Sequence, residues 1–475
     1  MFKHAGVVTI LFLGFSQVAA AATSISLVQA EQVALQRDPT TRAFLQQASA
    51  EEALSVAQSQ LPDPKLQLGV VNLPTDTFDL DQENMTQLKV GVQQAFPSFE
   101  RLRLRGEQGK DQGMVYQQMA AERRLHLQRE VRLIWLEQYY WLQAEKLVSE
   151  NREAFEQLLR VTRSLYEIGR NNQHDVIRAE LELHNLSDRL LRIKKRYQEE
   201  QANLSQWIGQ QGETNRVDDV LPNWMAVWHT PLVKTNERDA LLSHPKVSAF
   251  DAKVSRINKS VAISKTAYSP DWSLNLSYGQ RDDVPNGIDR ADFFSAMVTV
   301  DMPLFTENRQ DKRLAASHQR LAVAKDQRLS VLWEMQAQVR REQARSLRLA
   351  ERHALFEKYL LPQSHDQAIA ALFAYQNDQA DFGEVVRATM MELETQLDFQ
   401  RVTIDHLQSL ARLRYFLPGN LPSDVAKILP SNVSKSVSNN LLSNVPKKVS
   451  SSKSKIMLSH TSSDGLVDVE VEGAL

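Results

Sequence analysis

The sequence predicts a mainly α-helical chain with a small β part, organised as two internal repeats. Gly and Pro are scarce, at 16 residues each in a chain of 475, which favours long helices. Four short segments alternate apolar and polar side chains, as strands with one apolar face do. Breaker residues also recur at an offset of 206 positions: Pro39, Pro64 and Pro97 return as Pro245, Pro270 and Pro303. Such a duplication predicts pseudo-symmetry.

The composition and motif content argue against several classes of protein. A net charge of -2 gives no field that would attract nucleic acid. The chain has no cysteine, which excludes disulfides and thiolate metal sites. Its 11 histidines are scattered without ligand spacing, and no phosphate-binding loop or nucleophile elbow is present. We therefore expect no enzymatic activity, no cofactor and no metal site.

The first 22 residues are typical of a secretory signal peptide. A short basic start is followed by an apolar stretch that ends in four alanines, Ala19 to Ala22, with cleavage expected before Thr23. The alternative, a membrane anchor, is disfavoured because the run is short for a span. No later stretch is long and apolar enough for a transmembrane helix, so a membrane span would have to use strands.

Residues 23–210 form the first predicted repeat. A helix is expected from Ser26 to about Gln60, broken near Pro39. Two alternating segments follow, around residues 65–70 and 88–93, joined by a polar loop. No proline occurs between Ser98 and Leu221, which allows one helix of about 65 residues and about 100 Å.

The long helix and the segment that returns from it carry matching apolar patterns. A break at Gly169 to Asn172 separates the two. The return segment places apolar residues at alternating spacings of three and four: Val176, Ala179, Leu183, Leu186, Leu190, Ile193 and Tyr197. The outgoing helix repeats them every seven residues: Leu127, Ile134, Trp141, Val148 and Phe155. The pair should pack as an antiparallel coiled coil around a tight tip.

Residues 237–420 form the second predicted repeat, with the same order of elements. Helix is expected over about 237–268, and alternating segments over about 272–278 and 294–300. A helix over about 308–375 follows, bent at Pro362. Gln376-Asn377-Asp378 is the expected tip, and a heptad-patterned helix returns from it.

Two further segments lie outside the repeats. Residues 211–236 contain Pro222, Trp224, Trp228 and Pro231, and are expected to form a compact irregular linker at mid-height. Residues 421–475 change to a composition of Ser, Asn, Lys and Val, which is typical of a disordered low-complexity tail.

The alternating segments suit a membrane. Each spans about nine residues, the length that a tilted strand needs to cross an outer membrane. Trp272, Tyr278 and Phe294 would then be girdle residues at the interfaces. The alternative is a small soluble four-stranded sheet. Four strands are too few to close into a barrel, and strand edges without hydrogen-bonding partners are not tolerated in lipid. Several copies of the chain must therefore contribute strands to one shared barrel. A homotrimer would supply twelve strands and continue them as a helical tunnel.

Local motifs at the tips and helix ends identify a resemblance. The first tip carries Leu165-Tyr166-Glu167-Ile168-Gly169 and then Asp175-Val176-Ile177-Arg178-Ala179, and the second carries Leu372-Phe373-Ala374-Tyr375 and then Glu384-Val385-Val386-Arg387-Ala388. In this order, over Ser26 to Asn420, the chain resembles the TolC family of outer-membrane efflux channels. Leu61-Pro62-Asp63-Pro64 and Leu360-Leu361-Pro362 resemble the heavy-metal-efflux branch most.

The resemblance implies a TolC-like trimer with a shared 12-stranded outer-membrane β-barrel and a periplasmic coiled-coil tunnel. It implies a passive exit duct of a tripartite efflux system, with a periplasmic adaptor and an inner-membrane pump of the RND type as partners. Two alternatives stay open: the duct of type I protein secretion, and a periplasmic coiled-coil structural protein without a channel. The sequence does not separate metal ions, drugs and polypeptides as cargo.

The tips hold the candidate functional residues. Threefold symmetry would turn Asp378, Asp381 and Glu384 into an acidic ring that selects cations or holds a gate. The alternative is that they are ordinary acids at a helix N-terminus.

At the first tip, the resemblance points to adaptor contact through a set of five residues: Gly169, Arg170, Asn171, Asp175 and Arg178. Two departures stand out from the family pattern. The second tip lacks the glycine of Tyr-x-x-Gly, and Arg387 stands where an acidic residue is usual.

Overall fold

A computed structural model describes residues 24–169, 172–221, 237–283, 289–377 and 379–418. The predicted signal peptide, the tail, and the tip residues Arg170, Asn171 and Asp378 lie outside these residues. So does the linker from Pro222 onward, with its two tryptophans.

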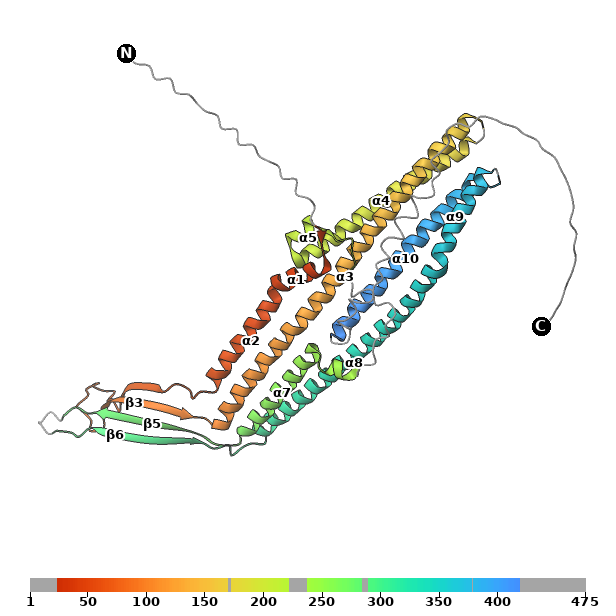
Figure 1. The fold of residues 1–475 in the computed structure, drawn as a ribbon. Coiled ribbons are helices and arrows are strands. Elements are labelled where there is room, and N and C mark those ends of the chain that lie inside the picture. Colours follow the sequence, from red (N-terminus) through yellow and green to blue (C-terminus); the bar gives the residue numbers. More distant parts are fainter. Residues whose placement is uncertain (1–23, 170–171, 222–236, 284–288, 378, 419–475) are drawn as a thin grey trace, which may run out of the picture. The chain divides into compact units, whose positions relative to one another are not determined.

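The first repeat runs from strand to long helical hairpin (Figure 1). Its elements in order are β1 (Ser24–Ile25), α1 (Leu27–Arg37), α2 (Pro39–Gln58), β2 (Lys65–Val71), β3 (Gln87–Phe96), α3 (Phe99–Glu167) and α4 (Gln173–Ile208). The expected 65-residue helix is confirmed by α3, which has 69 residues.

The second repeat has the same order of main elements, but its long helix is interrupted and no strand among its described residues corresponds to β1. It comprises α6 (Glu237–Leu242), α7 (Pro245–Thr266), β5 (Asp271–Gln280), β6 (Phe293–Asp301), α8 (Gln310–Leu355), η2 (Phe356–Leu360), α9 (Leu361–Gln376) and α10 (Phe382–Phe416). Between the repeats lie α5 (Gln210–Thr214) and β4 (Arg216–Val217). The start of the expected irregular linker is thus ordered, because β4 pairs in parallel with β1.

The first recurring proline begins the same helix in both repeats. Pro39 opens α2 and Pro245 opens α7. Proline suits the first helical turn because its missing N–H has no partner there in any case. The preceding residue caps each helix: Asp38 accepts a hydrogen bond from the Thr41 N–H at 2.7 Å, and His244 Nδ1 accepts one from the Lys246 N–H at 3.1 Å.

The four longer strands form one antiparallel sheet in the order β2-β3-β5-β6. The register aligns apolar side chains in rows across it, such as Leu68, Val90, Tyr278 and Phe294. Leu68 and Phe294 are 71% and 72% exposed, so the described residues leave this face uncovered. The opposite face is polar, with Gln67 bonded to Gln93 and Asn275 at 3.0 and 2.8 Å. The predicted two-faced strands are confirmed.

None of the helices that the structure describes has both the length and the apolar character needed to cross a membrane.

The coiled coil predicted for the first hairpin is also confirmed. On α3, Leu127, Val148 and Phe155 are buried, and on α4 so are Ala179 and Leu186. The remaining heptad positions, apart from Val176, pack in or against the same clusters, mostly as half-buried side chains. Both helices therefore present one apolar stripe to each other.

The bend expected at Pro362 takes a different form. One turn of π-helix, η2, interrupts the long helix just before this proline. Because Pro362 has no N–H, the carbonyl of Lys358 loses its helical partner. The wider π turn absorbs the disruption: the Leu361 N–H donates to the carbonyl of Phe356, five residues back.

Three glycines let α2 and α3 approach closely. α2 ends just before β2 and α3 begins just after β3, so the helices continue from neighbouring strands. Strands lie about 4.8 Å apart, whereas packed helices lie about 8–10 Å apart. A Cβ at Gly109 would lie 2.8 Å from Ser55 Cβ and 2.9 Å from its Cα. Gly106 and Gly113 follow the same face, with Gly113 less tightly packed.

We expect Gly109→Ala to destabilise the protein more than Gly113→Ala. Both changes gain the same helix propensity. Gly109→Ala forces the larger backbone displacement, because the nearest atom to a Cβ at Gly113 is the Ala48 carbonyl oxygen at 3.3 Å. The difference should be about 1–3 kcal/mol, visible as a lower midpoint of thermal unfolding by circular dichroism. Equal midpoints would contradict the close approach.

His244 should make stability depend on pH. Its Nδ1 accepts from Lys246, so its Nε2–H donates to the Tyr415 carbonyl oxygen at 2.9 Å and the buried ring is neutral. Burial lowers its pKa below the ordinary 6.5, although the Tyr415 bond opposes this. Between the folded and unfolded values the unfolded chain binds more protons, so stability falls as pH drops below 6.5.

His244→Asn keeps a capping acceptor and removes the titration. We expect the unfolding midpoint of this variant to vary less between about pH 7 and pH 5 than that of the wild type. His174→Asn, at an exposed position on α4, is the control. His126, whose pKa burial also lowers, contributes to the remaining slope. An unchanged slope in His244→Asn would count against the role of this ring.

Candidate functional site

The first tip, residues 166–178, turns on a left-handed glycine. Gly169 has φ +76° and its N–H donates to the Tyr166 carbonyl oxygen at 2.9 Å. No atom lies within 4 Å of where its Cβ would be, so backbone conformation and not space requires glycine. Asp175 lies in the first turn of α4, where a carboxylate is favourable.

The second tip spans residues 375–384, and its helix α9 ends at Asn377 with backbone angles close to those of Ile168 at the first tip. Asn377 keeps a negative φ of −101° and its N–H donates to the Phe373 carbonyl oxygen. The glycine of Tyr-x-x-Gly would stand at position 378, which lies outside the described residues. Asp381 caps α10 by accepting from the Glu384 N–H at 2.8 Å. The Glu384 side chain is exposed. An ordinary capping role for Asp381 is therefore present, and the acidic ring stays a prediction.

The two tips meet at one point that the sequence did not predict. Arg178, assigned to adaptor contact, reaches from α4 to the buried Gly383 in the first turn of α10. A side chain at Gly383 would collide with the Arg178 guanidinium and would lie 3.0 Å from the Asp381 carboxylate. Phe382 packs in the same apolar cluster as Ala179. Candidate residues of both tips therefore share one contact, for which Gly383 was the only local signal.

Farther from the tips, an ionic cluster joins the two helical hairpins. We call Arg401, Glu137, Asp405 and Gln408 the Arg401 cluster. From α10, Arg401 binds Glu137 of α3 at 2.8 Å and Asp405 at 2.6 Å. Gln408 also donates to Glu137, at 2.9 Å. The guanidinium lies 4.6 Å from the ring centre of Tyr140.

The charges in the Arg401 cluster compensate for its burial. Burial lowers the pKa of Arg401, but the bonds to Glu137 and Asp405 outweigh it and raise the pKa overall. All three side chains are about three-quarters buried. Hydrogen bonds between charged groups are shorter and stronger than hydrogen bonds between neutral groups. The cluster therefore fixes α10 to α3 at this level.

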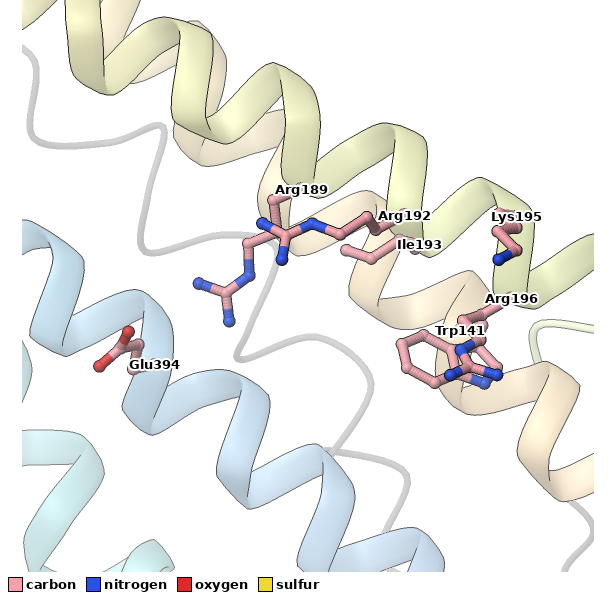
Figure 2. A pocket seen from close by; sticks show the side chains of 7 residues that line it. All are labelled: Trp141, Arg189, Arg192, Ile193, Lys195, Arg196 and Glu394. Atoms are coloured by element: carbon pink, nitrogen blue, oxygen red, sulfur yellow. The ribbon is translucent and has the colours of Figure 1, made fainter.

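Between the Arg401 cluster and the tips, a cleft of about 530 Å³ separates the hairpins. Figure 2 shows Arg189 and Arg192 on α4 on one side and Glu394 on α10 opposite them. Arg192 is bound to Asp188 of its own helix at 2.9 Å. Within the part of the chain that the structure describes, Glu394 makes no ion pair with these arginines. The two hairpins are thus less tightly linked here than at the Arg401 cluster.

The predicted girdle residues lie at the two ends of the apolar sheet face. Trp272, at the start of β5, stacks on Phe96 with ring centres 4.2 Å apart. Tyr278 and Phe294 pair across β5 and β6 at the other end. Aromatic side chains at both ends suit two membrane interfaces. Their interfacial role stays a prediction.

No group of three or more potential ligands that could hold a metal ion occurs among the described residues.

Solved structures share this fold, although comparison of sequences finds no related protein. A scan against models of protein families and a search of curated proteins both find no match. CusC, described in terms of transmembrane channel formation, has a TM-score of 0.70 and 15% identity over 82% of this chain and 91% of that one. The outer membrane protein VceC of Vibrio cholerae has a TM-score of 0.68 and 16% identity, over 83% and 97%.

The outer membrane channel MtrE of Neisseria gonorrhoeae, in its open state, has a TM-score of 0.66 and 16% identity, over 84% and 90%. The match extends over nearly the whole of these proteins. It confirms the mainly helical, TolC-like fold expected from the resemblance. The heavy-metal branch stays a prediction.

Breaking the Arg401 cluster should weaken the link between hairpins. We expect Arg401→Gln and Glu137→Gln each to lower the unfolding midpoint, and the double variant to lose less than their sum. The coupling energy should be about 1–3 kcal/mol. The control pair is Arg348 and Glu351, which are 74% and 54% exposed and should couple by less than about 1 kcal/mol. Additive losses at Arg401 and Glu137 would refute the link.

Proposed function

We propose that this protein is the outer-membrane channel of a tripartite efflux system and acts as a passive exit duct. The observation that carries the proposal is the sheet with one uncovered apolar face, joined to long helical hairpins in a fold shared with outer-membrane channels. An apolar face of this size is costly in water. A periplasmic structural protein has no use for it, whereas an outer-membrane protein does.

The functional unit is a homotrimer with its strands in the outer membrane and its helices in the periplasm. Within the chain, β2 and β6 are the outer strands of the four-stranded sheet and have no partner beyond them among the described residues. Pairing β6 of one copy with β2 of the next would close a ring. Three copies give twelve strands, and the polar face carrying Gln67 and Asn275 then lines the lumen.

The tips face the partners. A periplasmic adaptor docks on the first tip through Gly169, Asp175 and Arg178, together with Arg170 and Asn171. An inner-membrane pump of the RND type delivers the cargo and supplies the energy, so the duct itself needs no catalytic residue. The open space at Gly169, where no atom lies within 4 Å of the position of a Cβ, supports this assignment.

The second tip is the gate. Asp378, Asp381 and Glu384 of three copies form an acidic ring, and the contact of Arg178 with Gly383 holds the hairpins together when the duct is closed. The Arg401 cluster stays fixed while the segment beyond it, which is separated by the cleft at Glu394, moves outward. A shift of packed helices of this kind is a common switching motion.

Single-channel recording in a planar lipid bilayer tests both levels of the proposal. The purified protein should produce discrete conductance steps that prefer cations. Glu384→Lys, and the same change combined with Asp381→Asn, should alter conductance and reduce cation preference, because both remove negative charge from the ring. Asparagine keeps the α10 cap. Asp366→Lys, exposed on α9 away from the tip, is the matched control.

The outcomes separate the duct from the gate. Complete absence of conductance in the wild type and all variants would contradict the channel function. Wild-type conductance that stays unchanged in both tip variants would retain the channel and eliminate the acidic gate.

A further inference from the structure

A second cavity lies between α3 and α7, apart from both the tips and the cleft at Glu394. Its volume is about 520 Å³, within the range of small-molecule sites. Apolar side chains form much of its lining, among them Met119 of α3 and Phe250 of α7. Three cationic side chains of α7 also line it: Lys246, Lys253 and Arg256.

The positive charge in this cavity is poorly compensated. Among the described residues, the Lys246 and Arg256 side chains make neither an ion pair nor a hydrogen bond, and Arg256 Nε is buried without a partner. Lys253 reaches Gln327 at 2.9 Å, which is uncharged, and lies over the Phe250 ring. Glu122 is the one acid in the lining, and it already accepts from the Tyr415 hydroxyl at 2.6 Å.

We propose that this cavity binds an organic anion with an apolar body, such as an aryl or alkyl sulfonate or carboxylate. A buried donor without a partner is costly, and an anionic headgroup would supply the missing acceptor to Arg256. The apolar body would cover Met119 and Phe250, which an inorganic anion would leave bare. Cations are repelled by the three positive side chains.

This inference goes beyond the proposed duct and does not depend on it, because binding is measured without transport. The site lies where α7 runs beside α3, between His244 at the start of α7 and the strands that follow its end. An occupant would bridge the two repeats, since α3 belongs to the first and α7 to the second.

Isothermal titration calorimetry tests the site on the full chain in lipid nanodiscs, with naphthalene-2-sulfonate as the probe. Empty nanodiscs correct for partition into lipid. We expect one saturable site per chain. Arg256→Gln should weaken binding about tenfold, as expected for loss of a charged hydrogen bond. Lys246→Gln should weaken it in the same direction.

Matched controls separate the cavity from general charge. Lys265→Gln removes one exposed positive charge from the same helix outside the cavity and should leave the affinity unchanged. Ala249→Leu should abolish binding by filling the cavity without a change of charge. Circular dichroism verifies that each variant is folded.

The probe series completes the test. 2-Naphthylmethanol should bind more weakly than the sulfonate, and 2-naphthylmethylammonium should not bind. Absence of saturable heat, equal affinity for the neutral analogue, or an equal loss in Lys265→Gln would overturn the proposal.

Discussion

The arrangement of the whole chain depends on a β-sheet whose edges and apolar face cannot both be covered by one chain. The β2-β3-β5-β6 sheet presents a row of apolar side chains to its surroundings, and its outer strands expose backbone N–H and C=O groups. Water tolerates the free edges and opposes the apolar face, whereas lipid accepts the apolar face and forbids the edges. Pairing between copies meets both demands at once. The trimer in our proposal is therefore a consequence of strand chemistry rather than of the helices.

In our proposal, the helices convert this requirement into a duct with graded rigidity. Next to the strands, Gly109 allows α2 and α3 to pack closely, because a side chain there would collide with Ser55. At mid-height, the cap of α7 at His244 is bonded to Tyr415 near the end of α10. Closer to the tips, Arg401 fixes α10 to α3. Beyond that point, apolar packing around Phe382 and the reach of Arg178 to Gly383 hold the hairpins. Among the described residues, ionic links between the two hairpins become fewer toward the tips, which suits a moving end.

Features with a local periodicity could be predicted from the sequence. Alternation revealed the strands, heptad spacing revealed the coiled coil, and Pro39 marked the break in the first helix because proline acts on its own turn. The matching break before Pro245 was not predicted, since one helix was expected over about 237–268 and the structure divides it into α6 and α7. The Arg401 cluster could not be predicted in this way, because Glu137 and Arg401 are 264 residues apart and each also suits a solvated helix face. The β1–β4 pair could not be predicted, because a strand of two residues is too short to show an alternating pattern.

At the tips, prediction from the sequence was limited because one residue type suits several roles and because the contacting residues are far apart in the chain. Asp381 could be identified as an acid near a helix start, which agrees equally with a cap and with a gate. The structure adds the cap bond to Glu384 and the approach of Arg178 to Gly383. For the π turn, the sequence showed only that Pro362 lies within a helix. It does not tell whether the helix kinks before this proline or widens into a π turn.

Native mass spectrometry of the protein extracted in mild detergent tests the central claim most directly. Closure of the sheet between copies predicts a complex of three chains that survives removal of the detergent shell and dissociates only when the strands unfold. A folded single chain that keeps its β content and stays soluble without detergent would contradict it.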